Sequence, residues 1–174
     1  EKPFPVGKPK NLNTPAEIKS LPLPALAHWG LKEPDAQLPE PGERAARERF
    51  KKALGGIVQH YGNTRDIPSL QGTSRISQDL RFGLISIRTI HAELMKSRAA
   101  AKASERASID IYLKELAWRE FYFAILHHFP NVLEEEFNRE WRGLPWDAPD
   151  SNFEAWKTGR TGFPIIDAGM RELL

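Results

Sequence analysis

The chain has 174 residues, enough for one domain with a hydrophobic core, and its formal net charge is only +2. It contains no cysteine, which excludes a disulfide framework and a thiolate metal site. The small charge permits a nucleic-acid partner without requiring one. No apolar run is as long as a membrane span and no signal peptide opens the sequence, so we expect a cytoplasmic protein that does not contact a membrane.

Proline dominates the N-terminal arm, residues 1–42, which holds nine of the fourteen prolines. We expect most of this arm to be extended or irregular. One short helix is predicted within it, with Thr14 as N-cap, Pro15 at the first helical position and Glu17 closing a capping box. The sequence does not begin with methionine and stops at Leu174 inside an apparently helical run. We therefore expect it to be a piece of a longer protein.

A helix is predicted over Glu43–Tyr61, because apolar residues recur there at helical spacing and Gly62 follows as a stop. The other face of this helix is rich in arginine and lysine. We interpret that face as solvated in preference to a binding strip, since charge patterns alone are weak evidence. Residues 62–77 are rich in turn-forming residues and are predicted to be a loop.

Further helices are predicted over the rest of the chain. They cover Gln78–Leu84, the segment from a Ser86 cap to about Ala103, the segment from a Ser108 cap to just before Pro130, a segment from a capping box at Ser151–Glu154 to Gly159, and a last helix from Pro164. The residues predicted to face the core from the Ser86 helix are Ile87, Ile90, Leu94 and Met95. Residues 141–150 are expected to be irregular. No alternating strand pattern occurs anywhere, so the predicted fold class is all-α.

The stretch Glu115–Tyr122, with the sequence ELAWREFY, is the first candidate site. Glu115, Trp118, Arg119 and Tyr122 share one face of a helix that is apolar nearly all round, and such a helix is normally buried. One interpretation is that Glu115 and Arg119 neutralise each other while Trp118 packs in the core. The other is a pocket that binds a flat, polar-edged ligand by stacking and hydrogen bonding.

The second candidate site is Gly72–Ser77, with the sequence GTSRIS. Hydroxyl groups, an arginine and a permissive glycine precede a predicted helix, and free backbone N–H groups there favour a phosphate. The alternative is an ordinary helix cap made by Ser74 or Ser77. Elsewhere, Trp141, Trp146 and Trp156 form no single helical stripe, and His127 and His128 lack partners at metal-binding spacing, so no metal site is predicted.

Three motifs together resemble the DNA photolyase and cryptochrome family, and most closely the class I cyclobutane pyrimidine dimer photolyases. They are ELAWREFY, GTSRIS and Thr161–Arg171, with the sequence TGFPIIDAGMR, and they occur in the order and at about the spacing found in the family. The resemblance covers roughly residues 40–174. It implies the first half of the all-helical FAD-binding domain, with the N-terminal antenna domain, its second chromophore and the later helices lying outside this sequence.

The resemblance also implies roles for individual residues. The implied FAD contacts are Tyr61, Thr73, Ser74, Arg75, Ile76, Ser77 and Arg119, with Tyr112 standing where close relatives often have tryptophan. The implied DNA contacts are Arg65 on the backbone, Glu115 and Trp118 on the pyrimidine dimer, and Tyr122 beside them. Trp146 matches the outermost member of the tryptophan chain that reduces the flavin, and Trp156 resembles a neighbouring tryptophan off that route.

The function implied by the resemblance is light-driven repair of pyrimidine dimers in DNA. Reduced FAD donates an electron to a dimer that has been flipped out of the duplex. The expected protein is a monomer, associated with the nucleoid if it is bacterial. A cryptochrome, which is a flavin photoreceptor without repair activity, is the alternative, and a helical interaction domain without a cofactor is a third. Glu115 and Trp118 favour repair, because signalling members of the family often alter that pair.

Overall fold

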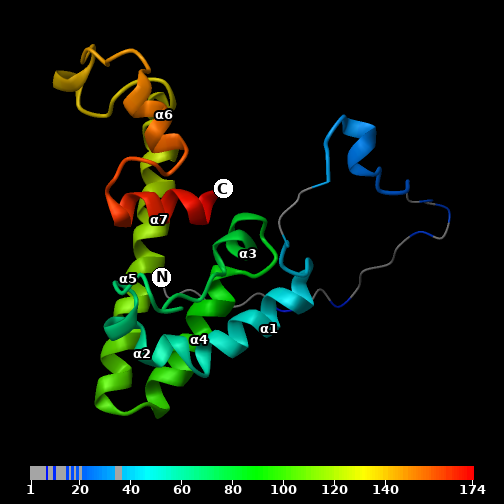
Figure 1. Ribbon diagram of the computed structural model, residues 1–174. Helices are drawn as coiled ribbons and strands as arrows, with labels where there is room; N and C mark the ends of the chain where they lie inside the picture. Colours follow the sequence, from blue (N-terminus) through cyan, green and yellow to red (C-terminus); the bar gives the residue numbers. More distant parts are fainter. Residues whose placement is uncertain are drawn as a thin grey trace. The chain divides into compact units, whose positions relative to one another are not determined.

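The computed structural model describes residues 7, 10, 15, 17, 19, 21–33 and 37–174. It contains seven α-helices within these residues: α1 Glu43–Leu54, α2 Ile57–Thr64, α3 Ser77–Arg81, α4 Ile87–Ala100, α5 Ala103–His128, α6 Ser151–Lys157 and α7 Pro164–Leu173 (Figure 1). Three 3-10 turns complete the list: Leu26–Trp29, Pro130–Leu133 and Arg139–Trp141. No strand occurs in the described residues, which confirms the all-α prediction.

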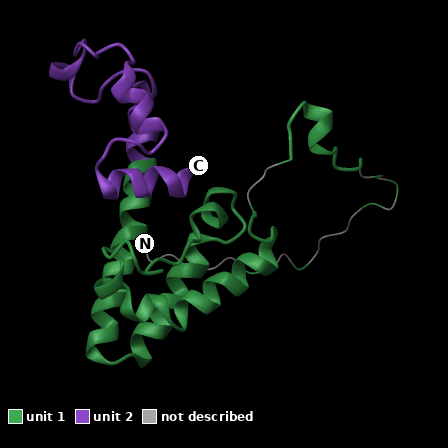
Figure 2. Cartoon of the chain, in the orientation of Figure 1, with its two compact units in different colours: residues 1–123 green, residues 124–174 purple. Residues whose placement is uncertain are grey.

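The chain forms two compact units, residues 1–123 and 124–174, and α5 passes from the first into the second (Figure 2). No helix of the described residues is long and apolar enough to cross a membrane. The short helix predicted to begin at Thr14 lies largely outside the described residues. The predicted division of the chain into an N-terminal arm, residues 1–42, and a helical region that follows it stays a prediction.

The core of the first unit forms where α1, α2, α4 and α5 meet. Fully buried or nearly buried side chains there include Phe50, Val58, Ile90, Leu94 and Ile109. α1 packs against both α2 and α4. Two of the predicted core positions on α4, Ile90 and Leu94, are thus confirmed, whereas Met95 is 44% exposed and its predicted inward position is wrong. Met95 follows Leu94 directly, so a helix turns it about 100° away from the buried stripe.

The helix predicted over Glu43–Tyr61 is two helices. Gly55 ends α1, and Gly56 has backbone angles of φ −145° and ψ −83°, which lie outside the helical region. A pair of glycines makes this break inexpensive, because neither carries a Cβ. Gly62 is not a stop either, since α2 continues to Thr64.

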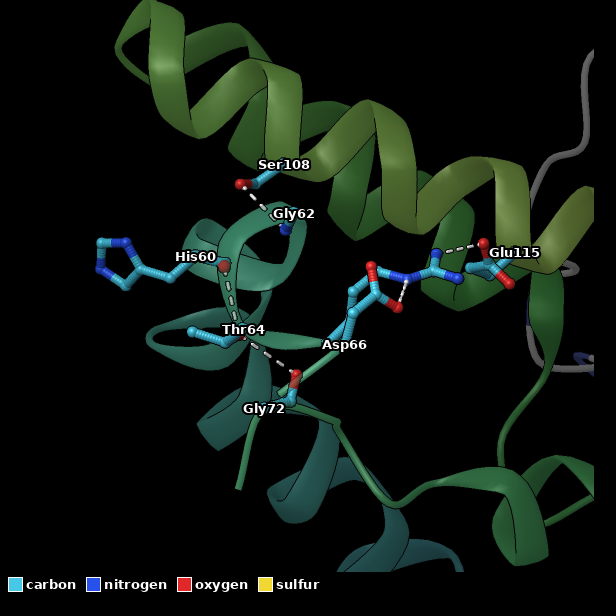
Figure 3. Close-up of polar contacts among 8 residues, drawn as sticks. His60, Gly62, Thr64, Asp66, Gly72, Ser108 and Glu115 are labelled. Atoms are coloured by element: carbon cyan, nitrogen blue, oxygen red, sulfur yellow. Dashed lines mark hydrogen bonds and ion pairs between the residues drawn. The ribbon is translucent and has the colours of Figure 1, made fainter. Parts of the chain in front are cut away.

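Gly62 is instead the place where α2 approaches α5. Its backbone N–H donates to the hydroxyl of Ser108 at 3.3 Å (Figure 3). Ser108 is buried inside α5, so its predicted role as the helix cap is wrong. The helix begins five residues earlier, where the carboxylate of Glu105 accepts from the N–H of Lys102 at 2.9 Å.

The second unit contains α6 and α7, which pack against each other. Asp150 caps α6 by accepting from the N–H groups of Asn152 and Phe153 at 2.9 and 3.0 Å, so the capping box predicted to start at Ser151 is wrong by one residue. The short aspartate side chain supplies the acceptor that a helix start needs. α7 begins at Pro164 as predicted.

Candidate functional site

The loop Gly72–Ser77 is fixed at its start by very close packing. A Cβ atom added to Gly72 would stand 2.3 Å from the carbonyl oxygen of Thr64, so only glycine lets the loop lie against the end of α2 (Figure 3). Arg75 has φ +50°, in the left-handed region that residues other than glycine enter at an energetic cost. The loop is therefore held in one specific conformation.

Neither Ser74 nor Ser77 caps a helix, so that alternative is wrong. The helix that follows, α3, has only five residues, and its N-cap Ile76 makes no side-chain capping bond. Ser77 is already helical, and the side chain of Ile76 is buried in the core of the first unit. The hydroxyl of Ser74 lies 2.7 Å from the hydroxyl of Tyr112 on α5.

A continuous series of contacts runs from Ser74 to Arg65. The rings of Tyr112 and Tyr61 meet edge to face with centroids 4.9 Å apart, and the guanidinium of Arg65 lies 5.3 Å from the centroid of Tyr61. Burial raises the pKa of Tyr112, so its hydroxyl stays protonated at neutral pH. These contacts bring together predicted cofactor residues from three segments of the chain.

Glu115 pairs with Arg65, not with Arg119. Figure 3 draws this ion pair as a dashed line that ends on the labelled side chain of Glu115. The pairing of Glu115 with Arg119 offered by the sequence is thus wrong. Arg119 instead binds Glu120 and lies 3.5 Å from the carbonyl oxygen of Leu80. The hydrogen bond to Glu115 raises the pKa of Arg65, so this guanidinium is charged at any physiological pH. Arg65, the predicted contact to the DNA backbone, follows the last residue of α2, and Glu115, the predicted contact to the dimer, lies on α5. The two side chains therefore form one ion pair.

The aromatic face of α5 is open in the described chain. Trp118 is 55% exposed and Tyr122 is 64% exposed, with their rings inclined by 28° and their centroids 6.1 Å apart. A hollow of about 340 Å³ lies beside Trp118 and Phe121. The prediction that this part of α5 is buried is wrong, because no other described segment of the first unit covers it. An exposed indole is available for stacking on a flat ligand.

The remaining predicted aromatic residues lie in the second unit. Trp146 is 84% exposed within an irregular segment. Trp156 on α6 stacks on Phe153, with centroids 5.7 Å apart. The role of Trp146 in electron transfer stays a prediction. The described residues contain no group of three side chains that could hold a metal ion.

Two basic residues of α1 border the predicted cofactor loop and were missed by the sequence reasoning. Arg49 and Lys52 line a cavity of about 200 Å³ together with Thr73, Ser74 and Arg75. Arg49 also pairs with the fully buried Asp79, so the basic face of this helix is not simply solvated. Guanidinium, ammonium and hydroxyl donors suit phosphate oxygens, and the residues present therefore fit the phosphate half of FAD. A buried aspartate cannot be recognised from sequence spacing, so no signal identified this contact.

Comparison with known proteins identifies the family of the chain. Residues 112–174 match the family model described as the FAD binding domain of DNA photolyase. Deoxyribodipyrimidine photo-lyase from Halobacterium salinarum is 36% identical over 98% of this chain, and the enzyme of the same name from Synechococcus is 36% identical over 95%. The crystal structure of a class III photolyase from Agrobacterium tumefaciens matches 90% of this chain with a TM-score of 0.78 and 30% identity.

The fold and these matches define a helical FAD-binding region. The chain belongs to the DNA photolyase family, and the predicted cofactor, FAD, is confirmed for that family. The chain spans about a third of the length of the relatives it matches, 36% and 34% of the two curated enzymes and 33% of the solved structure. The names of the curated relatives carry no class and the solved structure belongs to class III, so class I membership stays a prediction.

Proposed function

We propose that the full-length protein repairs cyclobutane pyrimidine dimers in DNA by light-driven electron transfer from reduced FAD. The curated relatives, each named deoxyribodipyrimidine photo-lyase, support the reaction. The observation that carries the assignment of residues is the Arg65–Glu115 ion pair beside the open face of Trp118. The pair supports this assignment, because it brings a cation and a carboxylate together on the helix that also carries the exposed ring of Trp118. We further propose that the protein acts as a monomer on DNA in the cytoplasm.

Trp118 provides the stacking surface in this proposal. Its indole is more than half exposed, and Phe121 holds it edge to face with centroids 5.5 Å apart. A base that stacks on an aromatic side chain gains about 1–3 kcal/mol. Because the contact needs only a flat partner, it acts mainly on the bound ground state. A flipped-out dimer offers such a partner, and a damaged pair costs less to extrude than an intact one.

Glu115 provides the polar contact. Its side chain is 39% exposed, and Arg65 binds one of its oxygens, Oε1. The other oxygen can accept from a base N–H. A hydrogen bond to a group whose charge changes during the reaction lowers the barrier only if it strengthens in the transition state. We therefore assign Glu115 a role in the repair step and Trp118 a role in binding.

The test uses the full-length protein with Trp118→Ala and Glu115→Gln. Trp118→Ala should weaken binding to dimer-containing DNA, with the repair yield per absorbed photon in the saturated complex less affected. Glu115→Gln should lower that repair yield, with a smaller loss of affinity. Glu93→Gln is the matched control, because Glu93 on α4 is a glutamate with 41% of its side chain exposed, and its partner Lys96 has no predicted role at the site. It should change neither quantity.

Two outcomes would contradict the proposal. If the full-length wild type shows no light-dependent repair of dimer-containing DNA, the photoreceptor alternative replaces it. If Glu115→Gln lowers the melting temperature strongly while the folded fraction keeps the full repair yield, Glu115 serves only the structure.

A further inference from the structure

The hollow beside Trp118 contains a lysine that has no predicted role. Lys114, Ala117, Trp118 and Phe121 line this hollow, whose volume is about 340 Å³. Lys114 and Trp118 lie four residues apart on α5, and that spacing makes two side chains neighbours on one face of a helix. Lys114 is exposed, as is the indole of Trp118. An ammonium group and a stacking surface are therefore neighbours in one concave site.

The charge of Lys114 is not taken up by an ion pair. Asp110, one turn earlier on the same helix, accepts hydrogen bonds from Arg98 on both of its carboxylate oxygens, at 2.6 and 3.0 Å. The bond from Arg98 is the main cause of the lowered pKa of Asp110, and the charge of Lys114 adds a smaller contribution. Lys114 therefore has no ion-pair partner of its own in the part of the chain that the structure describes.

Arg65, the predicted contact to the DNA backbone, is by contrast already shared between two carboxylates. Glu115 accepts a hydrogen bond from its Nη1, and Asp66 accepts one from its Nε at 3.2 Å. A phosphate that binds Arg65 has to compete with these two carboxylates. The ammonium group of Lys114 can bind a phosphate without breaking an ion pair, because it is a point charge on a flexible stem.

A phosphodiester is the ligand that suits this arrangement. A pyrimidine dimer forms from two adjacent nucleotides, so one phosphodiester joins its two halves and leaves the regular path of the duplex backbone when they are flipped out. Cβ atoms four residues apart on a helix are separated by about 5–6 Å, a distance that the stem of a lysine spans. A dimer that stacks on Trp118 thus brings its own phosphate within reach of Lys114.

We propose that Lys114 binds the phosphodiester inside the flipped-out dimer and so helps the protein to select damaged DNA. This inference rests on the proposed function, because it takes the dimer as the ligand that stacks on Trp118. An intact duplex keeps its bases stacked and brings no such phosphate to the hollow. Lys114 therefore contributes to the binding of damaged DNA alone, whereas a contact to the regular backbone, as predicted for Arg65, contributes to the binding of undamaged DNA as well.

The experiment compares Lys114→Ala with Lys102→Ala in the full-length protein. Lys102 is an exposed lysine about three turns before Lys114, so it matches the change in net charge. Affinity is measured for a duplex with one dimer, for the same duplex without damage, and for a dimer duplex in which a neutral methylphosphonate replaces the phosphate inside the dimer.

The three duplexes should respond differently. Lys114→Ala should weaken binding to the dimer duplex by about fivefold to tenfold, the loss expected for one exposed charge-assisted contact. It should leave the undamaged duplex and the methylphosphonate duplex at their wild-type affinities, and it should not change the repair yield per absorbed photon in the saturated complex. Lys114→Arg should keep most of the affinity for the dimer duplex, and Lys102→Ala should change none of these quantities.

Three results would overturn the inference. No loss for the dimer duplex excludes the contact, and equal losses for damaged and undamaged DNA make Lys114 a general contact to the duplex backbone. A loss that is as large for the methylphosphonate duplex as for the dimer duplex shows that the phosphate inside the dimer is not the partner. Failure of the proposed function looks different, because the wild type itself then shows no preference for dimer-containing DNA, and the inference falls with it.

Discussion

Gly72→Ala tests how the cofactor loop is attached to the core. The added Cβ atom would stand 2.3 Å from the carbonyl oxygen of Thr64, 2.6 Å from its carbonyl carbon and 2.9 Å from its Cβ. Two of these three atoms belong to the backbone at the last residue of α2, so no rotamer change can relieve the clash. Either the loop or the end of α2 must move.

The size of the movement sets the expected cost. Ordinary van der Waals contact begins at 3.4 Å, so the shift needed at the closest atom is 1.1 Å, the difference between 3.4 and 2.3 Å. Inserting a methyl group into packed structure with such a shift costs about 1–3 kcal/mol. For a chain of 174 residues each kcal/mol lowers Tm by about 2–4 °C, which predicts a drop of about 2–12 °C. The moved loop should also bind FAD less tightly in the full-length protein.

The assay is thermal unfolding of the chain followed by circular dichroism, with Gly55→Ala as the matched control. Gly55 has φ −78°, and a Cβ there would meet its nearest neighbour at 3.7 Å. Gly55→Ala should therefore leave Tm unchanged or raise the free energy of unfolding by about 0.4–1 kcal/mol. A Tm for Gly72→Ala within one degree of the wild type, on the order of the measurement error, would refute the packing argument.

Three further predictions concern Arg65 in the ion pair with Glu115, and Trp146 and Asp167 in the second unit. In the full-length protein Arg65→Ala should weaken binding to undamaged DNA and reduce the salt slope by about one phosphate contact, with a further loss for damaged DNA because Glu115 loses its partner; unchanged binding to undamaged DNA would contradict a backbone contact. Trp146→Phe should slow photoreduction of oxidised FAD and leave repair by reduced FAD nearly unchanged; equal photoreduction rates would leave Trp146 without an electron-transfer role. The hydroxyl of Thr161 lowers the pKa of Asp167, so the stability that the carboxylate adds is present at neutral pH and is lost as the pH falls through that lowered value. The difference in Tm between wild type and Asp167→Asn should accordingly shrink below about pH 4, and a constant difference down to acid pH would show that the carboxylate charge is irrelevant.

The sequence predicts elements well where the signal is local. The helical spacing of α4, the proline that opens α7 and the lack of strand alternation all depend on residues close together in the chain. The structure confirms both helices and the all-α class of the described residues, although Met95 on α4 is exposed. The boundaries fail where a neighbour in space decides them. In the sequence Gly62 predicts the end of a helix. In the structure α2 continues through Gly62, because α5 lies against this residue and the hydroxyl of Ser108 accepts its N–H.

Side-chain partners are the least predictable part of the site. Glu115 and Arg119 have the spacing of a helical ion pair, but Glu115 binds Arg65, which is 50 residues earlier. Arg49 likewise binds Asp79 across 30 residues. Nothing in the sequence selects these partners, since they depend on the packing of α1, α2, α3 and α5. The types of residue at the site are thus predictable, whereas their pairing is not.

The predicted anion site shows how a prediction can lose one of the physical causes it was argued from. The sequence predicted a phosphate site from the hydroxyls and the arginine of the GTSRIS loop, and also from the dipole and free N–H groups of the helix that follows. In the structure that helix, α3, has five residues, and its dipole is correspondingly small. The cations that line the cavity beside the loop are Arg75 of the loop itself and, from α1, Lys52 and Arg49, of which Arg49 is paired with the buried Asp79. Because side-chain charges can be removed one at a time, this origin predicts that Lys52→Ala weakens the binding of FAD to the full-length protein, whereas Lys51→Ala, at a residue that does not line the cavity, leaves it unchanged.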